Sequence, residues 1–147
     1  MAIYFYSTKD PYGEFSNFAK YPIELKGKIW PTSEHYFQAQ KFAGQPDEEE
    51  IRQAAKPMDA ARMGRERHRK LRSDWEVVKD NIMLEALRAK FSQHPMLKDL
   101  LLSTGDEELI EHTTNDNYWA DGGDGSGKNM LGKLLAQVRQ ELRQTDI

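Results

Sequence analysis

Residues 30 to 42 read Trp-Pro-Thr-Ser-Glu-His-Tyr-Phe-Gln-Ala-Gln-Lys-Phe, and the rest of the chain is organised around this stretch. Pro31 suits the position just ahead of a helix, and Thr32 or Ser33 can cap the free N–H groups of the first turn. No helix breaker follows before Gly44. The pattern therefore predicts one short helix.

Three polar side chains of this helix share one face. Glu34, Gln38 and Lys41 are spaced at i, i+4 and i+7, which aligns a carboxylate, an amide and an amine. Aromatic residues flank them, and this mixture is typical of the wall of a polar pocket. The alternative is an amphipathic helix whose Glu and Lys face solvent. The spacing alone leaves both interpretations open.

Length and composition limit the class of protein. At 147 residues the chain fits a single domain, 1–147, and it shows no repeat or linker. It contains no cysteine, which excludes disulfides and thiolate nucleophiles and favours a cytoplasmic location. No signal sequence or bilayer-length apolar run is present, so no membrane association is expected. The net charge of -3 argues against nucleic-acid binding by the whole surface.

Hydrophobic periodicity predicts a mostly helical α+β fold with a small β-sheet. Helices are expected within residues 30–42, 47–55, 58–63, 75–91, 96–101 and 129–143. Strands are expected at residues 3–6 and 108–112, with a hairpin over 21–30 that turns at Lys26-Gly27. The last helix has apolar residues at helical spacing, at Leu131, Leu134, Leu135, Val138 and Leu142.

A second polar cluster lies in the loop over residues 113–129, Thr-Thr-Asn-Asp-Asn-Tyr-Trp-Ala-Asp-Gly-Gly-Asp-Gly-Ser-Gly-Lys-Asn. Its glycines allow backbone N–H groups to approach a phosphate or diphosphate, and a helix start follows. The spacing from Gly122 to Lys128 matches a Walker A motif, but Asn129 replaces the Ser or Thr that binds magnesium, and no βαβ unit surrounds it. We therefore reject a P-loop. Asn129 is also suited to cap the helix.

Other candidate features have two interpretations each. The basic run at residues 65–72 is either a phosphate-binding surface or a solvated charge cluster. Asn17 lies between two phenylalanines and either contacts a ligand or closes a turn. The four histidines match no metal-ligand motif, so we expect no metal and no cofactor.

Four segments together carry a family resemblance. Residues 15–18 (Phe-Ser-Asn-Phe), 30–42, 61–65 (Ala-Arg-Met-Gly-Arg) and 118–122 (Tyr-Trp-Ala-Asp-Gly) resemble the YbiA-like family of the NADAR superfamily. The resemblance extends nearly end to end. Ala120 stands where the family usually has Gly, which leaves its neighbours in register.

The resemblance implies an α+β, mostly helical fold and a hydrolase of N-glycosidase type. Relatives are associated with cleaving phosphorylated ribosylamino intermediates of riboflavin biosynthesis, and others with removing ADP-ribose from modified guanine in nucleic acid. The expected partner is thus a nucleotide-like small molecule or ADP-ribosylated nucleic acid, with no obligate protein partner. The rival hypothesis is a module that binds ADP-ribose or a nucleotide without cleaving it. A nucleic-acid protein using residues 65–72 is a third.

The family motif also suggests roles for individual residues. Glu34 is the first candidate for the acid/base or charge-stabilising group, and Asp121 is the second. Lys41 is a candidate nucleophile that forms a Schiff base with an opened sugar. Trp119 and Tyr36 are expected to stack on the base, with core packing as the alternative for Trp119. The remaining expected substrate contacts are Asn17, Gln38, Arg62, Arg65, Gly122 and Asn129.

Overall fold

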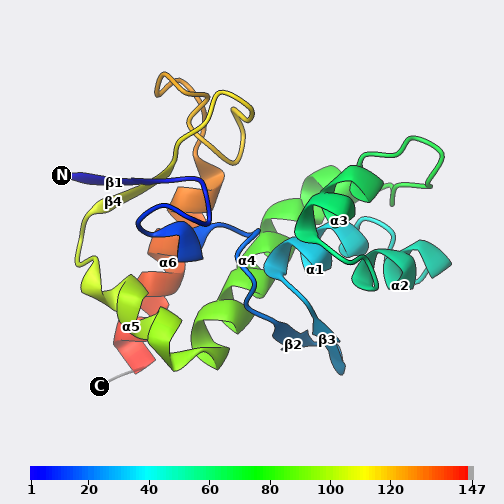
Figure 1. The fold of residues 1–147 in the computed structure, drawn as a ribbon, viewed down its shortest axis with the longest axis horizontal. Helices are drawn as coiled ribbons and strands as arrows, with labels where there is room; N and C mark the ends of the chain where they lie inside the picture. Colours follow the sequence, from blue (N-terminus) through cyan, green and yellow to red (C-terminus); the bar gives the residue numbers. More distant parts are fainter. Residues whose placement is uncertain (146–147) are drawn as a thin grey trace. The chain divides into compact units, whose positions relative to one another are not determined.

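The computed structural model describes residues 1–145, so Asp146 and Ile147, the end of the predicted domain, lie outside the described residues. The chain divides into two compact units. The first comprises Met1–Ala19 and the chain from Phe91 onward, and the second comprises Lys20–Lys90. Helix α4 (Trp75–Gln93) includes residues of both units. The predicted α+β, mostly helical fold class is confirmed (Figure 1).

The second unit begins with a β-hairpin. Strands β2 (Ile23–Leu25) and β3 (Lys28–Trp30) pair antiparallel, with Ile23 opposite Trp30. The two turn residues have positive φ, 56° at Lys26 and 73° at Gly27, as two-residue hairpin turns of the primed kind require. The predicted turn is therefore confirmed.

Helix α1 (Ser33–Gln40) follows the hairpin, and Thr32 caps it. The Thr32 hydroxyl accepts a hydrogen bond of 3.1 Å from the backbone N–H of His35, in the manner of an N-cap. All eight residues of α1 are buried. The interpretation of α1 as a surface helix is thus wrong, because Glu34 and Gln38 are buried and Lys41, just after the helix, is half-buried.

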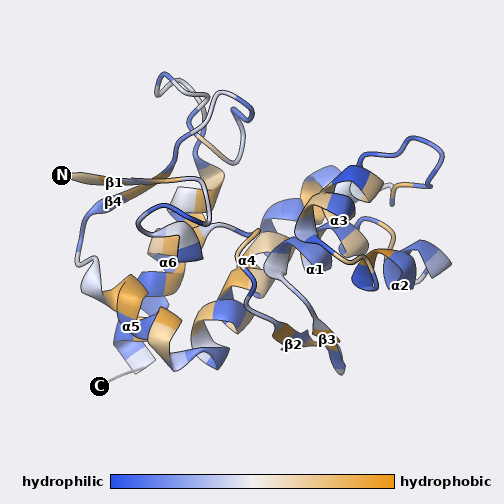
Figure 2. Ribbon diagram, in the orientation of Figure 1, coloured by the Kyte–Doolittle hydropathy of each residue, from blue (hydrophilic) through white to orange (hydrophobic). Residues whose placement is uncertain are grey.

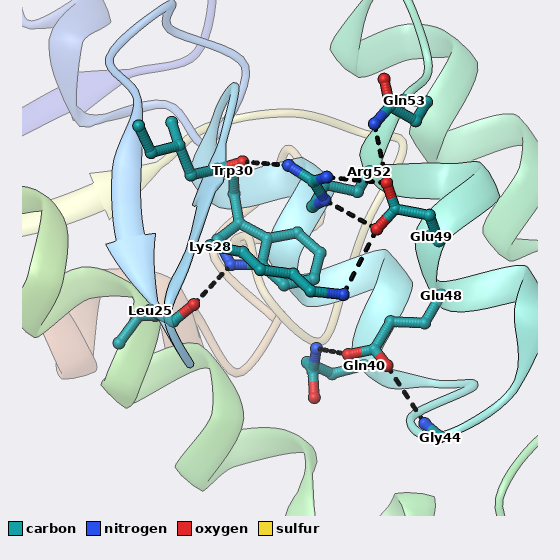
Figure 3. Close-up of polar contacts among 10 residues, drawn as sticks. Leu25, Lys28, Trp30, Gln40, Gly44, Glu48, Glu49, Arg52 and Gln53 are labelled. Atoms are coloured by element: carbon teal, nitrogen blue, oxygen red, sulfur yellow. Dashed lines mark hydrogen bonds and ion pairs between the residues drawn. The ribbon is translucent and has the colours of Figure 1, made fainter.

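Helices α2 (Pro46–Arg52) and α3 (Pro57–Gly64) pack against α1. Figure 3 shows how polar groups connect α2 to the hairpin: the Glu49 carboxylate accepts hydrogen bonds from Lys28, Arg52 and Gln53. Beneath this network is an apolar core formed by Ile23, Trp30, Tyr36, Ala39, Phe42, Ile51, Ala60, Met63, Ala86 and Ala89. The core fixes α1 on the side away from its polar stripe.

The first unit contains a parallel pair of strands, β1 (Ala2–Phe5) and β4 (Glu108–Glu111), seen side by side in Figure 1. The predicted small sheet is therefore two separate pairs. A 3₁₀ turn (Gly13–Phe15) and helix α5 (Pro95–Ser103) complete the unit together with α6 (Met130–Thr145), which contacts β4 and α5.

Helix α6 is amphipathic, and Figure 2 shows hydrophobic and hydrophilic residues alternating around it. The five apolar residues predicted to pack from this helix are all buried, as expected from their helical spacing. They are Leu131, Leu134, Leu135, Val138 and Leu142.

Candidate active site

The polar stripe of α1 contains a buried carboxylate–amide pair. The Gln38 side chain donates a hydrogen bond of 2.8 Å from Nε2 to Oε2 of Glu34. Each side chain is only 7% exposed. The i, i+4 spacing on a helix brings the two groups together, and burial strengthens the hydrogen bond between them. The i, i+4 spacing predicted the shared face but not this direct contact.

The amine of Lys41 lies one turn further along the stripe. Its Nζ donates a hydrogen bond of 3.3 Å to the backbone oxygen of Gly64 and lies 5.8 Å from the ring centroid of Trp75. Burial lowers the pKa of Lys41; the Glu34 carboxylate opposes this effect and the charge of Arg65 adds to it. A lysine with a lowered pKa has more neutral amine, which is the nucleophilic form.

Trp75 and Phe37 form an apolar flank beside this amine. Their ring centroids are 5.1 Å apart with an angle of 59° between the planes, and Trp75 is buried. From the sequence, Trp75 was placed only at the start of the helix expected within residues 75–91. A tryptophan at helical spacing gives no local signal that its ring also contacts a lysine of another helix.

Two arginines from the 61–65 motif are exposed at the end of α3. Arg62 is 3.5 Å from Glu66, and Arg65 carries the charge that acts on Lys41. Further along the basic run, Arg69 is different: its side chain is 6% exposed and pairs with acidic residues of α2 and with Glu66. The hypothesis of a phosphate-binding run thus fails for Arg69, which is an internal ion-pair centre.

Tyr36 does not have the role expected for it. Its side chain is fully buried, packs edge-on against Trp30 at a centroid distance of 5.0 Å, and donates a hydrogen bond to Glu85. Burial and that carboxylate raise the pKa of the Tyr36 hydroxyl. No ring face is available to a base, so the prediction of stacking by Tyr36 is wrong.

Asp121 is the centre of the polar cluster in the first unit. Its Oδ2 lies 2.7 Å from Nδ1 of His112, and its Oδ1 accepts hydrogen bonds from the N–H groups of Thr113 and Gly123. Burial alone would raise the pKa of Asp121, but these hydrogen bonds outweigh it and hold the pKa below its ordinary value. The carboxylate is therefore charged and fixed in orientation.

The glycine-rich loop uses its N–H groups internally. The N–H of Gly122 donates to the backbone oxygen of Asp116, and that of Gly127 donates to the backbone oxygen of Asp121. These groups are consequently not available to cradle a phosphate in this conformation. A cavity of about 660 Å³ adjoins the loop, and its lining includes His112, Asp121 and Lys128.

Three more predicted residues belong to the first unit. Asn129 bridges α6 and β4, because its side chain accepts from the N–H of Glu111 at 3.0 Å and donates to the oxygen of Leu109 at 2.8 Å. Its side chain thus binds the strand rather than capping the helix. Trp119 is partly buried against Tyr118. Asn17 is 8% exposed, and the expected ligand contacts of all three stay predictions.

The structure thus brings together Glu34, Gln38, Lys41 and Arg65 in the second unit, and it gathers Asp121, Gly122 and Asn129 in the first. Among residues 1–145, no group of three or more histidine and acidic side chains is arranged to hold a metal ion. Nor does this part of the chain contain a helix long and apolar enough to cross a membrane.

Comparison with known proteins decides the family. The family profile described as the NADAR domain matches residues 4–143. The chain belongs to the NADAR family. It is 60% identical over 140 residues to the N-glycosidase YbiA of Escherichia coli, an alignment that covers 95% of this chain and 88% of that protein. The predicted family membership is confirmed.

Other NADAR relatives agree with this assignment. An N-glycosidase of Nostoc punctiforme is 47% identical, with 97% of this chain and 94% of that protein covered. The solution structure of YbiA from Escherichia coli matches with a TM-score of 0.92 and 58% identity, covering 99% of this chain and 86% of that one. The predicted enzyme class, a hydrolase of N-glycosyl bonds, is confirmed at the level of the family.

Proposed function

We propose that this protein cleaves the C–N bond between a ribose and a nitrogenous leaving group, with α1 and the residue that follows it, Lys41, supplying the reacting groups. The observation that carries the proposal is the buried Glu34 carboxylate on the same helical face as Lys41, an amine whose pKa burial lowers. An acidic and a basic group that are both removed from solvent on one helical face are typical of catalytic sites.

Cleavage of a ribosyl C–N bond develops positive charge on the sugar ring. A fixed carboxylate beside the ring stabilises that charge, and an acid assists the departing nitrogen. Glu34 is held in one orientation by Gln38, which suits either role. Asp121 is the second candidate for the carboxylate, and its two oxygens already accept three hydrogen bonds.

Lys41 offers a covalent route to the same products. The neutral amine adds to C1′ of the ring-opened sugar, and the C1′–N bond to the base breaks as the base leaves with a proton. Water then adds to C1′ of the resulting imine, and the amine leaves, which returns the free enzyme and a sugar. Both routes consume one water and release base and sugar.

The substrate is a nucleotide-like ribosylamine. A relative named a riboflavin biosynthesis protein, from Vibrio vulnificus, is 42% identical over 142 residues, although this chain covers only 39% of that protein. That name supports a phosphorylated ribosylamino intermediate as the substrate. ADP-ribosylated guanine is the second candidate. In either case Arg62 and Arg65 are exposed guanidinium groups suited to a substrate phosphate.

The proposal is tested by a mass-spectrometric hydrolysis assay. Purified protein is offered a phosphoribosylaminopyrimidine and an ADP-ribosylated guanine oligonucleotide in parallel, beside Glu34→Gln and a control, Glu141→Gln. Glu141 is a matched control because it also pairs with a glutamine four residues away, but on the exposed face of α6. Release of base by wild type and control but not by Glu34→Gln supports the proposal. ADP-ribose binding without release by any protein indicates a binding module instead.

A further inference from the structure

Gly64 is the last residue of α3, and its Cα lies directly against the side-chain amide of Gln38. A Cβ atom at position 64 would lie 2.0 Å from Oε1 and 2.7 Å from Cδ of Gln38. Both distances are far shorter than a normal non-bonded contact. The Gln38 amide therefore occupies the space that any side chain at position 64 would need.

Backbone conformation does not explain a glycine at this position. Gly64 has helical geometry and is not among the residues of positive φ in the part of the chain that the structure describes. Within a helix, glycine is less favourable than alanine because it loses more conformational freedom on folding. The fold of α3 alone would thus favour alanine, and the space given to Gln38 is the feature that requires glycine.

The Gln38 amide is held in one orientation. Its Nε2 donates to Glu34, and its Oε1 is buried without a hydrogen-bond partner among residues 1–145. The reversed amide would place an acceptor oxygen against the carboxylate, which cannot donate. Glu34 thus fixes which way the amide points, and the absence of a Cβ at Gly64 allows it to lie there.

We infer that Gly64 is a positioning residue for the glycosidase reaction, acting through Gln38 on Glu34. The backbone oxygen of Gly64 also accepts a hydrogen bond from the Lys41 amine, so the positions of both Glu34 and Lys41 depend on this residue of α3. The inference rests on the proposed function. A bulkier residue at position 64 displaces the amide, releases the Glu34 carboxylate from its hydrogen bond and lowers turnover, while the backbone oxygen remains in place for Lys41.

The test compares Gly64→Ala with Gly44→Ala. Gly44 has a φ of 84°, and a Cβ there would meet no atom within 4 Å among the described residues. Alanine at position 44 should lower the melting temperature and leave kcat unchanged. Alanine at position 64 should lower kcat by about 10-fold or more, the usual effect of losing a hydrogen bond to a charged group. In a Gln38→Ala background it should have no further effect.

A second readout does not depend on activity. The side-chain amide signals of Gln38 in a ¹⁵N-correlated NMR spectrum, assigned by their loss in Gln38→Ala, should move in Gly64→Ala and not in Gly44→Ala. Unmoved signals with wild-type kcat would overturn the inference, as would additive losses in the double variant. If wild type cleaves no glycoside, the proposed function fails, while the NMR shift still tests the placement of Gln38.

The same variants also serve as a control for a folding defect. Should Gly64→Ala fail to fold, the combination with Gln38→Ala removes the clashing amide. A folded double variant then supports the packing of Gln38 against Gly64 as the cause. An unfolded double variant overturns it.

Discussion

The side-chain amide of Gln38 donates a hydrogen bond of 2.8 Å to the carboxylate of Glu34, and both residues are buried on one face of α1. Gln38→Glu keeps the shape of the side chain, removes the donor and places a second carboxylate beside the first. The two groups then share a proton, so the ionised form of Glu34 is disfavoured. We expect kcat to fall by about 10-fold or more at neutral pH, consistent with a lost hydrogen bond to a charged group.

The control for this prediction is Gln137→Glu. Gln137 donates a hydrogen bond of 3.2 Å to Glu141 on the exposed face of α6. Exposed pairs of this kind contribute little, so this variant should keep its rate and its melting temperature. Equal rates in Gln38→Glu and wild type would show that the orientation of Glu34 is not important for turnover.

The amine of Lys41 should titrate below its ordinary pKa of 10.5, because burial disfavours the charged form. Pulse acetylation at a series of pH values, with peptide mass spectrometry, measures the midpoint for this lysine. Glu34→Gln removes the charge that raises the pKa of Lys41, so the midpoint should move to lower pH. Arg65→Met removes a charge that lowers it, so the midpoint should move to higher pH. Shifts of the opposite sign would contradict the placement of these charges.

A covalent role for Lys41 makes a separate prediction. Borohydride added during turnover reduces an imine to a stable amine, so a sugar adduct should appear on the peptide that contains Lys41. Lys41→Met should give no adduct. The exposed Lys133 of α6 serves as a reference, since an adduct there would indicate non-specific reaction with free sugar aldehyde. Full turnover without any adduct on Lys41 would favour direct attack by water.

Asp121 should contribute mainly to stability. Asp121→Asn weakens the contacts to His112, Thr113 and Gly123, and a buried network of this size costs about 1–3 kcal/mol when a partner is lost. Because the pKa of Asp121 is lowered in the folded state, its stabilisation is present above the ordinary pKa of 3.8 and is lost as pH falls through the folded value. The variant should therefore lose less stability in acid than wild type.

Urea denaturation at a series of pH values from roughly 2 to 7, which spans the titration of carboxylates, measures how the stabilities of the variant and wild type differ. The control is Asp99→Asn, because that carboxylate is exposed on α5 and takes no part in the Asp121 network. If the stabilities of Asp121→Asn and wild type fell equally as the pH is lowered, the ionisation of this carboxylate would not be coupled to folding.

Local features of the fold were predictable from sequence. Gly27 indicates the hairpin turn because glycine readily adopts positive φ, and the spacing from Leu131 to Leu142 gives the packing face of α6. The pairing of β1 with β4 was not predictable, because it joins the start of the chain to a strand that lies far along the sequence. Local propensity does not specify such a partner.

The candidate site was predictable only in part. The spacing of Glu34, Gln38 and Lys41 gives their shared face, but whether that face is buried depends on α2 and α3. Tyr36 is an aromatic residue of the kind that can stack on a base. Its ring nevertheless lies in the core, because packing on the opposite side of α1 decides its position. The contact between Gln38 and Gly64 has no sequence signal, since it depends on how closely two helices approach.

If Glu34 takes part in cleaving the glycosidic bond, its amide variant should still bind the substrate but turn it over slowly. Glu34→Gln is measured by calorimetric titration with the substrate that the hydrolysis assay identifies, and by single-turnover base release. We expect a Kd close to that of wild type and a rate lowered by about 10²-fold or more, the usual contribution of an acid/base group. Base release at the wild-type rate by Glu34→Gln would contradict this role of Glu34.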